Sequence, residues 1–533
     1  MDIYHLPAEQ PPAPACPRSI ALGIFDGLHS GHRAVIAAAL HAGGGRCAVY
    51  TFAPGTVSTK PGNGRLCTAQ EETAILTQIG VQELFVTDFA AVRQLTPEQF
   101  VRDILVGQLH AGTVACGYNY RFGHGGCGDA ATLKQLCAAY GVAVTVLPPI
   151  EAAGQPVSSS AIRRALAEGD MPLARRLLGR GYCLRLPVIH GRQLGRRLGT
   201  PTVNQLLPAD FALPRFGVYA CAVELDGQTY TGVTNIGVRP TVGADAPLAE
   251  TWIQGFSGDL YGRTVAVYPV RFLRPEQKFA DVAALRTQVQ ADGAAAAALF
   301  TPAADQPIRA VLLDFDDTVH RRDDAFAEAM RQFLHRAFPA LPVAEFNSRL
   351  QELIAYNNYG YGMPCSYEEF FVRFLSLWPG SAVTPQEAYG HFCTDFAAAC
   401  RLCADVLPAI ERLRKRGLLI GAITNGSSLL QNAKLDLSGL RPHLDIAAVG
   451  EDEGIQKPDP RLFRRIAARL GLPCAACLYV GDNPGNDIAG ALAAGMRPVW
   501  IDRGFAAGHP SYAQPVPPQV PVIRSLAGLD ALT

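Results

Sequence analysis

The sequence has no excess of either charge and no long apolar run. Its 47 basic and 47 acidic residues cancel, which gives no indication of a nucleic-acid or acidic-lipid partner. The longest plain apolar run, Ala294 to Phe300, is far shorter than the roughly 20 residues that span a bilayer. The N-terminus also lacks the basic patch and apolar core of a secretory signal. We therefore expect a cytoplasmic protein with neither a membrane nor a nucleic-acid partner.

A disulfide framework is not indicated either. The 14 cysteines are scattered over 533 residues, which is typical of reduced thiols. Two Cys-x-x-Cys pairs, Cys400 with Cys403 and Cys474 with Cys477, would together suit a four-thiolate zinc site. The alternative is that these are small core residues, since free cysteine is often buried. The apolar run that follows Cys477 directly favours this alternative.

The chain does show a change of sequence pattern along its length, and the length itself suggests roughly three domains. Residues 1–180 alternate short apolar runs with helix-like segments, which predicts a doubly wound α/β domain. Buried parallel strands are expected at 20–24, 48–52, 83–87, 113–116 and 142–147, and helical structure at 159–179.

Residues 181–297 instead show short alternating runs, at 218–224, 229–233 and 264–268, with Asp226-Gly227 as a turn. This pattern predicts a small antiparallel barrel closed by a helix at 279–292. Residues 298–307 are expected to be a linker. Residues 308–533 return to α/β alternation, with strands at 309–313, 418–424, 477–480 and 498–501 and a helical insertion at 321–404.

The run from Gly23 to His32 is the first candidate site. It joins a predicted strand to a predicted helix through glycines, so unpaired N–H groups and the helix dipole would favour an anion there. His29 and His32 add two imidazoles, which indicates phosphate chemistry on a nucleotide.

This run resembles the Gly-x-Phe-Asp-Gly-x-His-x-Gly-His signature of bacterial bifunctional riboflavin kinase/FAD synthetases. The segments 158–163 and 117–123 match further motifs of the family in order. The resemblance implies adenylyl transfer from ATP to FMN, with His29 and His32 as catalytic residues. It assigns ATP and phosphate binding to Gly23, Phe25, Asp26, Gly27, Gly31, Ser159 and Arg163, and flavin binding to Asn119, Arg121 and Phe122.

A second match begins at Gly195 and runs to Asn204, and resembles the flavokinase motif of the same family. It implies phosphorylation of riboflavin to FMN by ATP, with Glu250 as the general base. Gly195, Thr202 and Asn204 are implied to bind ATP, and the last two to hold Mg²⁺, which prefers hard oxygen ligands. Four departures from the family pattern bear on flavin or nucleotide affinity. Ser160 replaces Thr, Trp252 replaces His, Leu186 lies in a stretch where glycine is usual, and no His follows Pro54.

A third site is indicated by two carboxylates, Asp314 and Asp316, at the end of a predicted strand. Such a pair can divide nucleophilic attack and proton transfer between its members. With Thr424, Asn425, Lys457, Asp482 and Asp487 following later strands, the region resembles the haloacid dehalogenase (HAD) phosphohydrolases. The resemblance implies an aspartyl-phosphate at Asp314, acid/base catalysis by Asp316 and phosphoryl binding by Thr424, Asn425 and Lys457. Mg²⁺ is implied at Asp314, Asp316, Asp482 and Asp487, and the insertion at 321–404 is implied to be a cap.

The substrate of the third site is left open by the sequence. A phosphorylated metabolite is expected, and fusion to flavin enzymes favours the phosphorylated ribitylaminopyrimidine that precedes riboflavin. An FMN phosphatase beside a kinase that makes FMN would run a futile cycle. The alternatives are a general nucleotide or sugar phosphatase and a non-catalytic flavin-sensing or scaffolding module.

Overall fold

The N-terminal unit is built on a six-stranded parallel sheet with the order β1-β4-β3-β2-β5-β6. The computed structural model describes residues 1–533 except 15, 43–45, 54–55, 57–63, 153, 192–198, 239–246, 302–305, 358–364 and 506–514. The strands are β1 Asp2–Leu6, β2 Arg18–Leu22, β3 Cys47–Phe52, β4 Glu83–Thr87, β5 Ala111–Gly117 and β6 Ala143–Leu147. All five residues of β2 are buried, as expected for a central strand covered on both faces. The edge strand β1 was not expected from the sequence.

Helices cover this sheet, and the last two of them lead along the chain to the barrel. They are α1 Ser30–His41, α2 Ala69–Gln78, α3 Phe89–Val92, α4 Pro97–Gln99, η1 Phe100–Gln108, η2 His124–Gly126 and α5 Ala130–Ala138. A short hairpin, β7 Glu151–Ala152 and β8 Gln155–Pro156, precedes α6 Ser159–Glu168 and α7 Met171–Leu178. The helical structure expected at 159–179 is present but divided into these two helices. Gly169 ends α6 in the left-handed conformation that favours glycine, with φ +78°.

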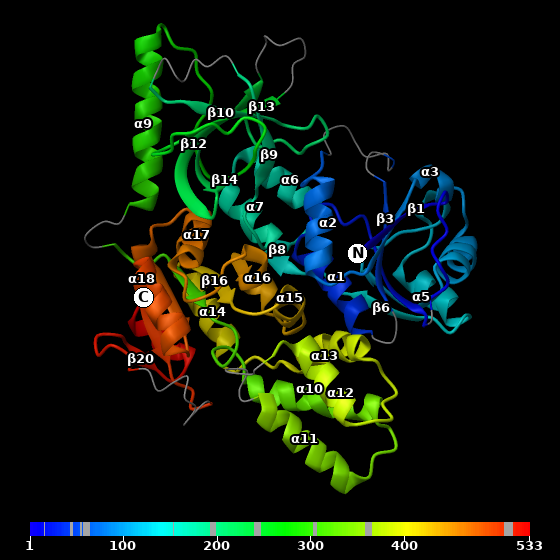
Figure 1. Ribbon diagram of the computed structural model, residues 1–533. Coiled ribbons are helices and arrows are strands. Elements are labelled where there is room, and N and C mark those ends of the chain that lie inside the picture. The colour runs from blue at the N-terminus through cyan, green and yellow to red at the C-terminus, as the bar shows by residue number, and fades with distance from the viewer. Residues whose placement is uncertain are drawn as a thin grey trace.

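The middle unit is a closed barrel with the strand order β10-β13-β12-β11-β14-β9. Its strands are β9 Leu184–Ile189, β10 Thr202–Leu206, β11 Gly217–Leu225, β12 Gln228–Val238, β13 Pro247–Ile253 and β14 Thr264–Arg274. Strand β13 alternates strictly between buried and half-buried residues, which is the pattern of a barrel wall. Helix α9, Val282–Phe300, packs against the outside of the barrel (Figure 1). Because α9 runs to Phe300, the connection to the third unit is shorter than the expected 298–307.

The C-terminal unit holds a second parallel sheet, with the order β17-β16-β15-β18-β19-β20. Its strands are β15 Ala310–Leu313, β16 Leu419–Thr424, β17 Ile446–Val449, β18 Cys477–Gly481, β19 Arg497–Ile501 and β20 Val522–Ile523. The flanking helices are α14 Val406–Lys415, α15 Ser428–Leu437, α16 Gly450–Glu453, α17 Pro460–Leu470 and α18 Ala489–Ala494, with the single turns η4 Arg441–His443, η5 Cys474–Ala476, η6 Pro484–Ile488 and η8 Leu526–Ala531.

The insertion between β15 and β16 is helical, as the sequence predicts. Helices α10 Arg322–Ala337, α11 Val343–Asn357, α12 Tyr367–Leu377 and α13 Pro385–Ala399 lie together as a separate layer (Figure 1). Phenylalanines of α10, α12 and α13 fill the centre of this layer, with Phe326, Phe370 and Phe392 each buried. The expected multidomain fold, α/β then barrel then α/β with a helical insertion, is confirmed.

The third unit packs against both of the others. On the N-terminal unit, Arg33 of α1 donates to Asn432 Oδ1 at 2.9 Å and to Asp436 Oδ2 at 3.1 Å, both on α15. On the barrel, Arg469 of α17 pairs with Glu224 of β11. The three units therefore form one packed body, as Figure 1 shows. Within the described ranges, no helix has the length and hydrophobicity needed to cross a membrane.

The two Cys-x-x-Cys pairs lie apart from any candidate metal cluster in the described part of the chain. Cys400 and Cys477 are buried, and all four thiols are free. The structure thus favours the interpretation of these cysteines as core residues.

Candidate active sites

The turn between β2 and α1 is held in a strained backbone conformation. Phe25 and Leu28 have φ of 44° and 42°, values that side chains larger than glycine rarely adopt. Gly27, with φ +81°, fits against Leu66, whose side chain would clash with a Cβ at 2.7 Å. Strain of this kind persists where the surrounding structure enforces it, often at functional sites. Here it brings His29 to the first turn of α1.

His29 and His32 form a stacked pair at the start of α1. Their ring centroids are 3.6 Å apart, and His29 Nδ1 accepts a hydrogen bond from His32 N at 3.2 Å. Burial lowers the pKa of His29 to about 3, with Arg180 and Arg163 adding to the effect. Burial also lowers the pKa of His32 well below its usual range, with His29 and Arg180 adding to it. Both rings are therefore neutral at pH 7, and His32 Nδ1 is buried without a hydrogen-bond partner among the described residues.

The segment 158–163 lies against this turn, although it is more than a hundred residues away in the sequence. Ser159 Oγ donates to Asp26 O at 3.0 Å, and the Arg163 guanidinium binds the Asp26 carboxylate and Gly64 O. Ser158 caps α6 by accepting from Ala161 N at 3.2 Å. The fold thus joins the two motifs that the sequence singles out, with Asp26 between them.

The third motif is placed at the carboxyl end of β5. Asn119 and Arg121 are exposed there, whereas Phe122 is buried and its ring lies 5.5 Å from that of Phe100. Phe122 is thus part of the core of the N-terminal unit.

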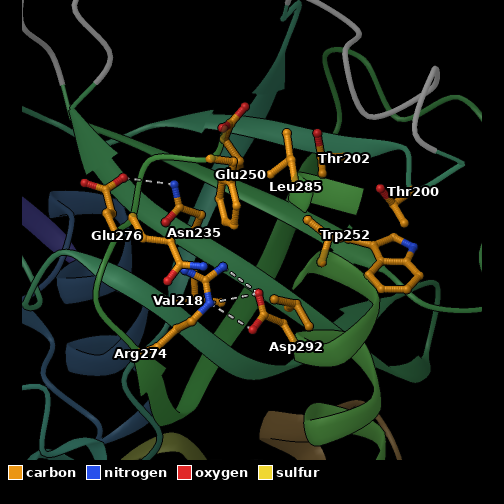
Figure 2. Close-up of a pocket in the computed structure, with 14 residues that line it drawn as sticks. Thr200, Thr202, Val218, Asn235, Glu250, Trp252, Arg274, Glu276, Leu285 and Asp292 are labelled. Carbon is orange, nitrogen blue, oxygen red and sulfur yellow. Dashed lines mark hydrogen bonds and ion pairs between the residues drawn. The ribbon is translucent and has the colours of Figure 1, made fainter. Parts of the chain in front are cut away.

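The barrel carries a cavity of about 190 Å³ between its wall and α9 (Figure 2). Cross-strand register explains which residues meet there. Glu250 on β13 lies directly opposite Asn235 on β12, and Thr202 lies opposite Trp252, and all four line the cavity. Glu250 also lies opposite Asn204 on β10, which is not among the lining residues. Asn204 is buried, and its Oδ1 atom has no hydrogen-bond partner among the described residues. The predicted ligand Gly195 lies outside the described residues.

An ion pair that the sequence did not indicate closes the other end of this cavity. Arg274 on β14 pairs with Asp292 on α9, with Nη2 to Oδ2 at 2.7 Å (Figure 2). The next residue, Gly293, is required by Trp252, because a Cβ there would lie 2.3 Å from the indole. Only the packing of α9 on the barrel reveals these residues, since β14 and α9 have no shared motif in the sequence.

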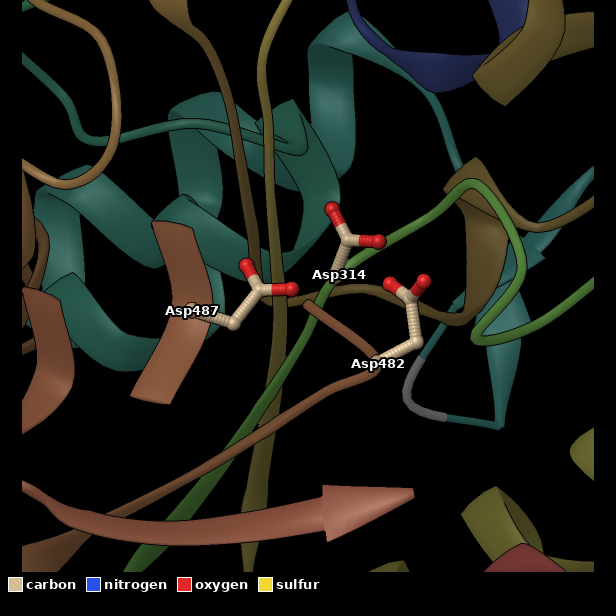
Figure 3. Close-up of side chains that lie close together, drawn as sticks. All are labelled: Asp314, Asp482 and Asp487. Carbon is tan, nitrogen blue, oxygen red and sulfur yellow. The ribbon is translucent and has the colours of Figure 1, made fainter. Parts of the chain in front are cut away.

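In the C-terminal unit, three carboxylates meet at the carboxyl end of the sheet (Figure 3). Asp314, Asp482 and Asp487 place ligand atoms within 4.8 Å of one another, and all three are buried. Lys457 Nζ lies 2.5 Å from Asp314 Oδ1 and 2.7 Å from Asp487 Oδ1. Burial raises the pKa of Asp314 to about 7 against the opposing effect of Lys457, and Asp487 adds to the rise. Such a set of hard oxygens fits a divalent cation.

Asp316 lies beside this cluster but is directed elsewhere. Its carboxylate is bound by Lys434 Nζ at 2.8 and 2.9 Å, by His320 Nε2 at 2.7 Å and by Gln431 Nε2 at 3.1 Å. Although burial raises the pKa of Asp316, Lys434 and His320 lower it well below its usual range. Its side chain is not among the three clustered carboxylates. The geometry therefore fits a role for Asp316 in proton transfer better than its predicted role as a side-chain metal ligand.

The C-terminal unit has a cavity of about 430 Å³ between the sheet and the helical insertion. The predicted phosphoryl-binding residues and Asp314 line it. Thr424 is buried at the end of β16, and Asn425 fixes Lys457 by exchanging two hydrogen bonds with its backbone, of 2.8 and 2.9 Å. From the insertion come Arg322, Ser366, Tyr367, Glu368 and Tyr389. These residues were not singled out in the sequence.

Comparison with known families divides the chain in the same way. The family model for FAD synthetase matches residues 12–161, that for riboflavin kinase matches 178–300, and that for haloacid dehalogenase-like hydrolases matches 308–495.

Curated relatives cover the first two units. The bifunctional riboflavin kinase/FMN adenylyltransferase of Pseudomonas fluorescens is 39% identical over 294 residues, which are 53% of this chain and 93% of that protein. The Escherichia coli (strain K12) protein of the same name is 34% identical over 281 residues, 51% of this chain and 90% of that protein. A crystal structure titled macrolide-efflux protein from Streptococcus pneumoniae is similar with a TM-score of 0.50 and 28% identity, over 56% of this chain and 99% of that one.

Proposed function

The chain belongs to the bifunctional riboflavin kinase/FMN adenylyltransferase family, and from this premise we propose which residues carry out each reaction and what its C-terminal HAD-like hydrolase unit does. The first two units phosphorylate riboflavin with ATP and transfer adenylate from ATP to FMN. The predictions of an enzyme and of a third, HAD-like unit are confirmed.

For the kinase, we assign Glu250 as the base that removes the proton of the riboflavin 5′-hydroxyl. The supporting observation is that Glu250 lines the cavity beside the polar side chains of Asn235 and Thr202, with Asn204 as its neighbour on β10. Thr202 and Asn204 would hold Mg²⁺, and the unpartnered Asn204 Oδ1 fits this role. When bound, the ion would neutralise charge on the ATP phosphates.

For adenylyl transfer, the FMN phosphate attacks the α-phosphorus of ATP and pyrophosphate leaves, without a covalent enzyme intermediate. The neutral rings of His29 and His32 act as hydrogen-bond donors to the phosphates at the start of α1. Arg163 and Ser159, held at the turn by Asp26, position the pyrophosphate.

For the third unit, Asp314 attacks the phosphorus of a monoester. Asp316, ionised beside Lys434, relays the proton that the monoester monoanion brings to the leaving oxygen and later accepts one from the attacking water. An aspartyl-phosphate forms, and water then hydrolyses it. Lys457 binds the transferred phosphoryl group. Asp314, Asp482 and Asp487 would hold Mg²⁺, which would offset repulsion between the phosphate and these carboxylates.

The cavity supports a substrate with a ring and hydroxyl groups. Tyr367 and Tyr389 offer aromatic faces, while Glu368, Gln431 and Gln456 offer polar groups. We propose the phosphorylated ribitylaminopyrimidine precursor of riboflavin. A general nucleotide or sugar phosphatase is the second candidate, and the cavity volume of about 430 Å³ is compatible with it.

The test gives the whole protein riboflavin and Mg²⁺-ATP and follows FMN, FAD and free phosphate by chromatography. Replacing Glu250→Gln should lower FMN formation by about 10²- to 10⁴-fold and leave FAD formation from added FMN unchanged. Glu276→Gln, a carboxylate in the same cavity, is the matched control. Formation of FMN at the normal rate by the Glu250 variant would contradict the assignment.

The hydrolase assignment is tested separately with Asp314→Asn in the full chain. Phosphate release from the ribitylaminopyrimidine phosphate should fall by at least about 10³-fold, while both flavin reactions continue. Asp502→Asn, which follows β19 and does not line the cavity, is the control. Faster turnover of nucleotide or sugar phosphates than of the pyrimidine by the unaltered protein would refute the substrate proposal.

A further inference from the structure

A cavity of about 300 Å³ lies where the three units meet, away from the three sites described above. Arginines from every unit line it: Arg175 of α7, Arg271 of β14, and Arg309 and Arg416, which flank β15 and α14. The rest of its described lining is apolar or glycine, with no acidic side chain. Four cations thus face one small space.

Three of these guanidinium groups, those of Arg175, Arg271 and Arg309, have few partners in the described part of the chain. Arg175 is 4% exposed, its Nη1 donates to Leu470 O at 3.2 Å, and its Nε is buried without a hydrogen-bond partner. Arg416 donates to Thr533 Oγ1 at 2.8 Å and to Asp530 O at 3.2 Å, and its Nη2 also binds the terminal oxygen Thr533 O. Neither Arg271 nor Arg309 forms an ion pair with a described residue.

The nearby carboxylate of Asp445 is already engaged. It pairs with Arg176 at 2.7 Å and Arg414 at 3.3 Å and accepts from Ile420 N at 2.8 Å, and it does not line the cavity. It therefore cannot serve as the counter-ion for all four arginines.

The lowered pKa values of two cavity arginines also indicate that the cavity lacks negative charge. Burial lowers the pKa of Arg175 to about 10, and burial together with Arg271 lowers that of Arg309. A buried cation such as Arg175 is costly without a counter-ion, and guanidinium groups match phosphate oxygens in charge and geometry. A ligand with several negative charges would relieve this repulsion.

We propose that this arginine pocket binds the oligophosphate group of a small molecule, either inorganic pyrophosphate or the phosphate chain of a nucleoside triphosphate. The volume suits such a group, with a nucleoside projecting into solvent beside Arg271, which is exposed. Because each unit supplies at least one arginine, the bound ligand holds the three units together. The site would not exist without the C-terminal unit, which contributes Arg309 and Arg416.

Calorimetric titration of the full chain with pyrophosphate, ATP and orthophosphate tests this, with EDTA present to weaken binding at the metal-dependent sites. The double variant Arg271→Ala/Arg309→Ala should bind one pyrophosphate or ATP fewer, or bind it at least about a hundredfold more weakly, roughly tenfold per arginine. Its riboflavin kinase and adenylyltransferase rates at low pyrophosphate should stay unchanged. Pyrophosphate should also raise the melting temperature of the unaltered protein more than that of the variant.

Arg93→Ala/Arg524→Ala removes two exposed arginines elsewhere and is the matched control. Arg271→Lys/Arg309→Lys should recover part of the affinity, because charge is kept and the planar fork is lost. Should the alanine variant fold poorly, Arg271→Glu alone, on an exposed strand position, should abolish the same binding event. Binding of ATP but not pyrophosphate would identify a nucleotide site, and the reverse a pyrophosphate site. Equal stoichiometry and affinity in the unaltered and double-variant proteins would overturn the proposal.

Discussion

The histidine turn and the aspartate cluster both bury ionisable groups, but they treat charge in opposite ways. In the cluster, Lys457 lies within 2.7 Å of both Asp314 and Asp487, so buried carboxylates are kept beside a buried cation. At the turn, the carboxylate of Asp26 is paired with Arg163, and burial keeps the rings of His29 and His32 neutral. Arg163, the nearest cation of the turn motifs, is neutralised by Asp26.

The two sites therefore differ in the charge that they carry before a phosphate binds. The cluster crowds several carboxylates into a small space, which raises the pKa of Asp314 and Asp482, so it depends on cations to keep these groups ionised. The two imidazole rings of the turn are uncharged in advance and provide donors whose proton affinity rises when an anion arrives. A change in charge should therefore disturb the cluster strongly and the turn weakly.

Removing the Lys457 cation should have the largest effect on this difference between the two sites. Lys457→Met leaves Asp314, Asp482 and Asp487 buried without it and should destabilise the C-terminal unit by about 3–5 kcal/mol. Phosphatase activity should fall by at least about 10³-fold. Denaturant titration and phosphate release measure the two effects. Lys415→Met, at an exposed position, is the control, and a variant at Lys457 that keeps normal stability would show that the carboxylates are protonated.

Binding of Mg²⁺ tests the need of the aspartate cluster for cations, with a smaller expected effect on stability. Mg²⁺ at about 100 times its dissociation constant should stabilise the chain by about 2.7 kcal/mol, since it binds only the assembled cluster. EDTA should reverse the gain. In Asp482→Asn, which removes one of the three ligands, the gain measured by thermal unfolding should largely disappear. An undiminished gain in this variant would place the ion elsewhere.

Acid sensitivity is the smallest expected effect and tests the turn. The folded-state pKa of His29 is about 3, below its unfolded value of 6.5. Between these pH values the unfolded chain therefore binds a proton on His29 that the folded chain does not bind. His29 therefore costs no stability above pH 6.5 and lowers it progressively from pH 6.5 toward pH 3. His29→Asn keeps a helix-capping side chain and should reduce the stability loss between pH 7 and 5 by at most about 2 kcal/mol.

Denaturant titrations at both pH values measure this difference. His41→Asn, an exposed histidine on the same helix, is the control. If both variants lose stability in acid to the same extent as the unaltered chain, the rings at the turn are not held neutral by burial.

Much of the fold could be predicted from short apolar runs. Strands β2, β3, β4, β5, β15 and β18 lie where buried runs flank helix-like segments, since such runs suit strands covered on both faces. Several elements were missed: the edge strands β1, β17 and β20, the barrel strands β9, β10 and β13, the hairpin of β7 and β8, and the break at Gly169. Edge strands bury less apolar surface, and a helix break between two amphipathic helices leaves the apolar period almost unchanged.

For the candidate sites, too, some residues could be placed from the sequence and others could not. Asp314, Lys457 and Asp487 could be placed together because parallel strands end at one edge of a sheet. The pairing of Arg274 with Asp292 and of Lys434 with Asp316 could not, because the partners come from elements whose packing no motif encodes.

The sequence by itself determined the order of the three units and the residue types of each site, because local patterns and motif spacing carry that information. Only the tertiary structure decided how charge is distributed among these residues. Burial makes His29 and His32 neutral, and Lys434 keeps Asp316 ionised. The meeting of three units gathers Arg175, Arg271, Arg309 and Arg416 around one cavity. Burial and through-space pairing depend on the final packing, which no single segment of the chain specifies.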